Sequence, residues 1–99
     1  MAYGRWAAMV ERQPSREAQI VRGILQYLHD HPQAKDTVEG ISQWWLPREA
    51  GYTTAEVDRA VTQLISEGLI VTTQRKGSPQ CYAANPSRLG SISKFLKGS

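Results

Sequence analysis

Few side chains in this sequence could act as nucleophiles or as metal ligands. Cys81 is the only cysteine, and His29 and His31 are the only histidines. Imidazoles two residues apart on a helix point away from each other, which disfavours a shared metal ion. The sequence has no H-E-x-x-H, no G-x-S-x-G and no phosphate-binding glycine loop. We therefore expect no enzyme, no metal site and no cofactor.

The basic side chains are more informative, because they are unevenly distributed. Residues 69–99 contain five basic residues and no acidic one, whereas residues 30–68 contain seven acids and three bases. The formal net charge is +3 and the pI is about 9.3. A mildly basic chain with its positive charge near both ends favours a polyanionic partner.

The composition bounds the class of protein. A chain of 99 residues has room for one modest core, and 40% hydrophobic residues is ordinary for a globular domain. No apolar run approaches the roughly 20 residues of a membrane-spanning helix, and the first residues lack the apolar stretch of a signal peptide. With one cysteine, no internal disulfide can form. We expect a cytoplasmic protein that does not enter membranes.

The clearest element is a helix over residues 54–67. Thr53 and Glu56 form a T-x-x-E capping box at its start, and Gly68 stands where a left-handed residue ends a helix. Its apolar face recurs at helical spacing, at Val57, Ala60, Val61, Leu64 and Ile65. The opposite face carries Ala55, Arg59, Thr62 and Ser66, flanked by Asp58 and Gln63.

Two further helices precede this one. Ser15 can cap a helix that continues to about His31, ends before Pro32 and has the apolar stripe Val21, Ile24, Leu25 and Leu28. A shorter helix starts at Asp36 or Thr37 and carries Val38, Ile41 and Trp45 on one face. Trp44 falls outside that face. We favour packing of Trp44 and Trp45 in the core and at its edge over a role in an interface or a ligand pocket.

The chain after Gly68 has the pattern of a β-hairpin followed by a short tail. Two β-forming runs, Leu69–Gln74 and Gln80–Ala84, flank the turn sequence Lys76-Gly77-Ser78-Pro79. Beyond Pro86 the residues Leu89, Ile92 and Leu96 predict a final amphipathic turn or two, with frayed last residues. We therefore divide the chain into a helical extension (1–14), a domain (15–85) and an amphipathic tail (86–99).

The order of these elements resembles the winged helix-turn-helix fold, an α+β fold with a three-helix core and a two-stranded wing. The resemblance rests on Gly51-Tyr52-Thr53, on Val57, Arg59, Ala60 and Leu64, and on the run Glu67-Gly68-Leu69-Ile70. It covers residues 15 to 85 and is closest to small bacterial regulators of the MarR type. The stretch between Ile41 and Gly51 is about five residues longer than is usual for that pattern.

The resemblance implies a sequence-specific transcriptional regulator that binds double-stranded DNA. Helix 54–67 would enter the major groove, and the wing 74–80 would lie on the backbone. The side chains expected to contact bases are Arg59, Thr62, Gln63 and Ala55. Those expected to contact the DNA backbone are Thr53, Thr54, Arg75, Lys76 and Ser78. Against this stand Glu56 and Asp58, whose carboxylates would repel phosphates if they turned outward.

Other roles are left open. The N-terminal side chains Tyr3, Trp6 and Val10 can share one helix face, and they either cover their own domain or contact a second subunit. The homodimer that we expect would pair them with Leu89, Ile92, Phe95 and Leu96. The acidic middle and the surplus aromatic residues suggest an alternative, a protein–protein interaction module without DNA binding. A variant of the regulator hypothesis adds an effector pocket lined by Trp44, Trp45 and Tyr52.

Overall fold

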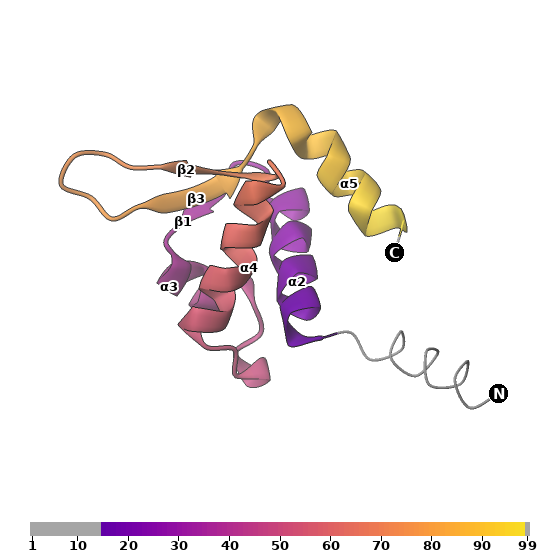
Figure 1. The fold of residues 1–99 in the computed structure, drawn as a ribbon, viewed down its shortest axis with the longest axis horizontal. Coiled ribbons are helices and arrows are strands. Elements are labelled where there is room, and N and C mark those ends of the chain that lie inside the picture. The colour runs from indigo at the N-terminus through magenta and orange to yellow at the C-terminus, as the bar shows by residue number, and fades with distance from the viewer. Residues whose placement is uncertain (1–14, 99) are drawn as a thin grey trace.

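In the computed structural model, which describes residues 15–98, helices α2, α4 and α5 pack beside a three-stranded antiparallel sheet (Figure 1). The structure is thus α+β and mainly helical, as the sequence predicted. Its elements in chain order are α2 (Arg16–Asp30), β1 (Lys35–Asp36), α3 (Val38–Gly40), the π-helical turn η1 (Ile41–Trp45), the 3-10 turn η2 (Arg48–Ala50), α4 (Thr54–Ser66), β2 (Ile70–Thr73), β3 (Cys81–Ala84), the 3-10 turn η3 (Pro86–Arg88) and α5 (Leu89–Gly98).

Helix α2 forms for the local reasons visible in the sequence. The Ser15 hydroxyl accepts a hydrogen bond from the Ala18 backbone N–H at 3.1 Å, and the helix ends at Asp30 with His31 as its C-cap. Ile20, Ile24, Leu25 and Leu28 are fully buried along one side. This side packs against α4 and, further along, against α5.

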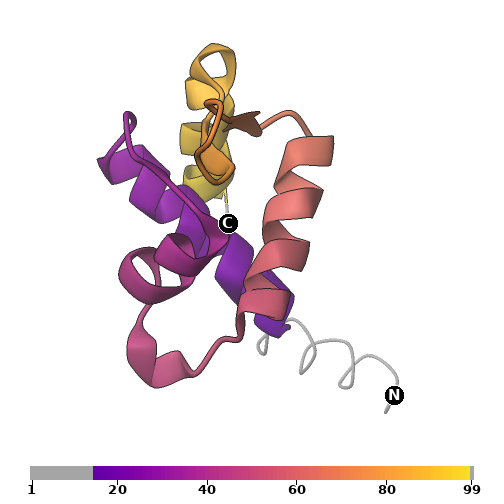
Figure 2. The same cartoon turned by 90° about the vertical axis from the view of Figure 1, so that its left-hand side faces the viewer.

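The segment between α2 and α4 differs most from the predicted short helix. Lys35 and Asp36 form strand β1, so the helix starts at the second of the two predicted positions, where Thr37 caps α3 by accepting from the Gly40 backbone N–H at 3.1 Å. The helix then widens into η1 and is followed by η2, which ends at Gly51 with φ +67°. Figure 2 views the molecule from the hairpin side and shows this long connector looping below α4. The extra residues between Ile41 and Gly51 are therefore taken up by a π-helical turn and a separate 3-10 turn.

The C-terminus of α4 leads directly into the sheet. The Gly68 N–H donates to the Ile65 carbonyl at 2.9 Å, and the Leu69 N–H donates to the Leu64 carbonyl at 3.0 Å. With Gly68 at φ +79°, this is a Schellman motif that turns the chain into β2. Strand β3 lies in the centre of the sheet, in the order β1-β3-β2. Its register pairs Ile70 with Ala84 and Asp36 with Tyr82.

The C-terminal segment is more regular than the predicted amphipathic turn or two. Helix α5 is ten residues long, and Ile92 is fully buried among residues of the same chain. Asn85 connects this helix to the rest, because its side-chain amide donates to the Gly68 carbonyl at 2.8 Å and its side-chain oxygen caps η3 by accepting from the Ser87 N–H at 3.0 Å. None of the described helices is long and apolar enough to cross a membrane.

Candidate nucleic-acid interface

Helix α4 has a fixed start that orients its exposed face. The Thr53 hydroxyl accepts from the Glu56 backbone N–H at 3.1 Å, and the Glu56 carboxylate accepts from the Thr53 backbone N–H at 3.0 Å. The predicted capping box is confirmed. Since the hydroxyl and the N–H of Thr53 both serve this cap, Thr54 is the better placed of the two threonines for a ligand.

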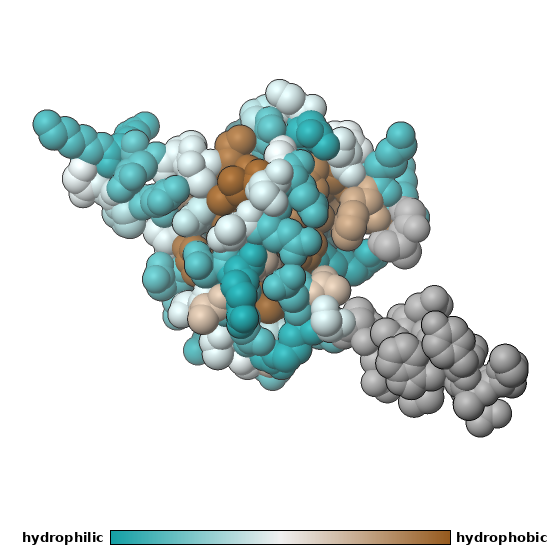
Figure 3. Space-filling view, viewed as in Figure 1, coloured by the Kyte–Doolittle hydropathy of each residue, from teal (hydrophilic) through white to brown (hydrophobic). Residues whose placement is uncertain are grey.

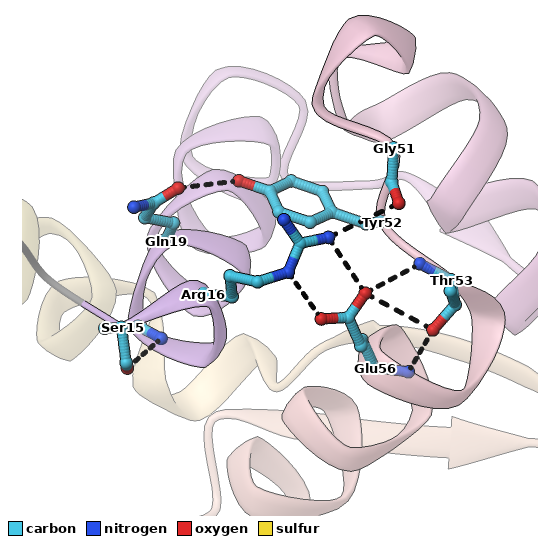
Figure 4. A network of polar contacts seen from close by, with 8 residues as sticks. Ser15, Arg16, Gln19, Gly51, Tyr52, Thr53 and Glu56 are labelled. Carbon is cyan, nitrogen blue, oxygen red and sulfur yellow. Dashed lines mark hydrogen bonds and ion pairs between the residues drawn. The ribbon is translucent and has the colours of Figure 1, made fainter.

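A polar network ties this start to α2. Figure 4 shows the Glu56 carboxylate between the cap and the guanidinium of Arg16, which donates to it at 2.7 and 3.0 Å. The same guanidinium lies 5.0 Å from the centre of the Tyr52 ring, and the Tyr52 hydroxyl donates to Gln19 at 3.1 Å. The hydrogen bonds from Arg16, followed by the one from the Thr53 N–H, lower the pKa of Glu56 to about 2.

This network was not predicted, because Arg16 and Glu56 are forty positions apart and nothing in either local pattern joins them. It changes the electrostatic argument for α4. The negative charge of Glu56 is met by a bidentate guanidinium of the same chain, which removes one of the two carboxylates that counted against an anionic ligand.

The outer face of α4 is open along its length. Ala55, Arg59 and Thr62 are exposed, as is Gln63, whose amide donates to Glu67 at 3.3 Å. Arg59 borders a hollow of about 160 Å³ with Glu17 and Glu56, yet no ion pair holds it within residues 15–98. The side chain that we expect to contact bases is therefore neither buried nor paired.

The hairpin tip presents the predicted cations. The Ser78 N–H donates to the Arg75 carbonyl at 2.9 Å and closes a turn in which Gly77 takes φ +81°. Arg75, Lys76 and Ser78 are all exposed. The hairpin extends well beyond the helices in Figure 1, and its end is hydrophilic in Figure 3. This end is an exposed, positively charged projection and not part of the core.

Between α4 and the base of the hairpin lies a groove of about 380 Å³ that is acidic. Thr54, Ala55 and Asp58 line it from α4, Pro79, Gln80 and Tyr82 from the hairpin, and Thr37, Val38 and Glu39 from the start of α3. Burial raises the pKa of Tyr82, and the charges of Asp58 and Glu39 raise it further. Sequence reasoning noted Asp58 only as a charge on the helix and did not find Glu39. The cations of α4 and of the tip are therefore separated by two carboxylates.

The residues predicted for a dimer interface fall into three groups. Tyr3, Trp6 and Val10 lie outside the described residues. Leu89 and Phe95 are exposed by 36% and 44%, and Leu96 is half-buried. Ile92 has no exposed surface, because it fills the space between α5 and the core of its own chain. The prediction that Ile92 contacts a second subunit is therefore wrong, because its side chain is already buried within its own chain.

The aromatic residues near the long connector have separate surroundings. Trp45 is 8% exposed and stacks on Tyr27 with ring centres 4.7 Å apart, whereas Trp44 is 65% exposed. The preferred interpretation, in which both tryptophans pack in the core and at its edge, holds for Trp45 alone. Tyr52 is half-buried and bonded to α2. Trp44, Trp45 and Tyr52, the residues expected to line an effector pocket, thus lie in three different environments.

Neither the side-chain clusters nor the comparisons add a second site. Within residues 15–98 no group of three or more His, Cys, Asp or Glu side chains could hold a metal ion. Cys81 is half-buried, and its thiol donates to the Pro79 carbonyl at 3.8 Å. Comparison of the chain with protein-family models, with curated proteins and with solved structures found no match.

Proposed function

We propose that this chain has a winged helix-turn-helix fold and is a sequence-specific DNA-binding protein, a transcriptional regulator. The order helix, strand, helix, helix, strand, strand, with β3 between β1 and β2, supports the fold. One observation carries the function. The first turn of α4 and the hairpin residues Pro79 and Gln80 line the same groove, and the exposed basic residues Arg75 and Lys76 lie further along that hairpin, so α4 and the hairpin can meet one ligand.

In this proposal α4 enters the major groove. Its thirteen residues give a helix about 20 Å long, and an α-helix with its side chains is about 10–12 Å across, which matches a major groove roughly 12 Å wide. Ala55 and Thr62 are small enough for the helix backbone to approach base edges closely. Arg59 then makes a bidentate contact with O6 and N7 of guanine, and Gln63 lies at the edge of the reading face. Thr54, at the positive end of the helix, contacts a phosphate oxygen.

The hairpin provides contacts that do not depend on sequence. Arg75 and Lys76 lie on the phosphate backbone, with Ser78 as a hydrogen-bond donor beside them. These contacts have to supply affinity that α4 lacks, because Asp58 remains uncompensated on its face. A homodimer formed through Leu89, Phe95, Leu96 and the N-terminal extension would double them and place two α4 helices on half-sites about one helical turn apart.

The test is binding to a pool of genomic DNA fragments, followed by fluorescence anisotropy on selected duplexes across a range of salt concentrations. Arg75→Ala and Lys76→Ala should each weaken binding to all sequences alike and reduce the salt slope by about 1. Arg59→Ala should cost about 1–3 kcal/mol on the cognate duplex and relax the preference at one base pair.

Lys94→Ala is the matched control, because Lys94 is an exposed cation on α5, which packs against α2. It removes the same charge and should leave both the salt slope and the base preference unchanged. Absence of binding to any genomic fragment at low salt would refute the proposed function, and equal effects of Lys94→Ala and Lys76→Ala would refute the role of the hairpin.

One observation favours a second candidate function, a protein–protein interaction module. Trp44 exposes 65% of its surface, and exposed tryptophan is enriched in protein interfaces. A stoichiometric protein partner that stays bound at high salt and after nuclease treatment, but is lost in Trp44→Ala, would support this candidate. Loss of the partner on nuclease treatment would favour DNA binding instead.

A further inference from the structure

We propose that Asp58 determines sequence specificity by selecting cytosine in the major groove. The inference rests on the proposed function and names a base that α4 reads beyond the guanine assigned to Arg59. Asp58 is exposed on the wing side of α4, and none of the ion pairs within residues 15–98 includes it. Its carboxylate faces the groove that α4 shares with the base of the hairpin.

The surroundings of Asp58 disfavour a phosphate beside its carboxylate, so the phosphate proposed for Thr54 lies at the N-terminus of α4, about one turn before Asp58. Glu39 lines the opposite part of the same groove, so a DNA strand running along it would bring its phosphates close to two carboxylates. By contrast, Glu56 is already paired with Arg16 and does not act on the groove in this way. A duplex can therefore occupy this space only by presenting base edges to Asp58, with its backbone held at the hairpin tip.

The walls next to Asp58 allow a base edge to come close. Its neighbours on α4 that line the groove are Thr54 and Ala55, which have short side chains. From the hairpin, Pro79, Gln80 and the ring of Tyr82 line the groove, and none of them brings a further carboxylate or ammonium group. A hydrogen-bonded contact between the carboxylate and a base is therefore not blocked by a bulky side chain of α4.

The chemistry of the base edges then identifies the partner. A carboxylate only accepts hydrogen bonds, and the major-groove donors are the amino groups of cytosine and adenine. The amino group of adenine lies between two acceptors, its own N7 and O4 of the paired thymine, and these repel a carboxylate, whereas the amino group of cytosine has an acceptor on one side only, O6 of the paired guanine. Guanine and thymine present acceptors at this edge. Cytosine is thus the base that Asp58 tolerates best.

The experiment is selection from a randomised duplex pool, followed by titration of duplexes that differ at one base pair. The wild-type protein should prefer cytosine at one position by about tenfold in Kd. Asp58→Ala should abolish this preference. Asp58→Asn should move it towards adenine, because an amide can both accept from the adenine amino group and donate to N7.

Glu49→Gln is the matched control, since Glu49 is an exposed carboxylate on η2 and lies outside the groove that contains Asp58. It should raise affinity for all sequences slightly and change no base preference. If wild-type protein binds DNA selectively but Asp58→Ala and Asp58→Asn keep its base preferences, Asp58 does not select cytosine and the proposed function stands. If wild-type protein binds no DNA, both proposals fail.

Discussion

Replacement of Ile92 by alanine tests whether α5 belongs to the core of its own chain. Ile92 is fully buried. The change removes three carbons at about 0.8 kcal/mol each, so about 2.5 kcal/mol is lost before any cavity is counted. A partly collapsed cavity brings the expected loss to about 3 kcal/mol, within the usual 2–5 kcal/mol for such truncations. For a domain of 99 residues this is a fall in Tm of about 10 °C or more.

The assay is urea unfolding followed by circular dichroism at several protein concentrations. A residue inside its own chain destabilises the monomer, so the loss should be the same at every concentration. Lys94→Ala, two positions further along the same helix and exposed, should change the free energy of unfolding by less than about 0.5 kcal/mol. A loss for Ile92→Ala that disappears at high concentration would show that Ile92 is buried between subunits and would refute the reasoning.

Three further predictions follow from single features of the structure. Gly68→Ala should lower the free energy of unfolding by about 1 kcal/mol or more, because φ at position 68 is +79°. Gly90 lies in α5 with open space around it, so Gly90→Ala should raise the free energy of unfolding by about 0.5–1 kcal/mol. Chemical denaturation of both variants measures these changes. The pKa of Glu56 is about 2 when folded and 4.5 in its ordinary state. The stabilisation from Glu56 is therefore complete above pH 4.5 and is lost as the pH falls towards 2, and Arg16→Met should flatten this part of a pH–stability curve. Trp44→Phe should remove a large part of the fluorescence that iodide quenches, since the side chain is 65% exposed, and a quenching curve identical to wild type would contradict its exposure.

The elements that the sequence predicted well are those with complete local signals. Helix 54–67 matches α4, whose last residue is Ser66 with Glu67 as C-cap, because a capping box, an apolar stripe and a C-terminal glycine all mark the same segment. The observed hairpin matches the predicted one for a similar reason. Two β-forming runs flank a turn in which residue 77 takes φ +81°, a conformation that glycine adopts without strain.

The elements that the sequence did not predict depend on contacts between residues that are distant in the chain. Strand β1 is only Lys35–Asp36, and it exists because Tyr82 and Ala83 offer it a partner strand. The ion pair between Arg16 and Glu56 likewise needs α2 and α4 to be packed already. For α5 the amphipathic pattern identified an apolar side but not the surface that covers it. Ile92 was therefore assigned to a second subunit, whereas the structure buries it in its own chain.

Under the proposed function, the distribution of charge on α4 favours one particular way of binding DNA. Of its first acidic residues, Glu56 is neutralised by Arg16, so the repulsion left on the helix comes from Asp58, reinforced by Glu39 across the groove. Arg59 lies on the other side of Asp58 from the hairpin, where it borders Glu17 instead. A duplex bound here is thus attracted at Arg59 and at the hairpin tip and repelled in between. This pattern disfavours non-specific binding, because any backbone path through the groove meets two carboxylates, and it leaves base edges as the groups that can lie there with least repulsion.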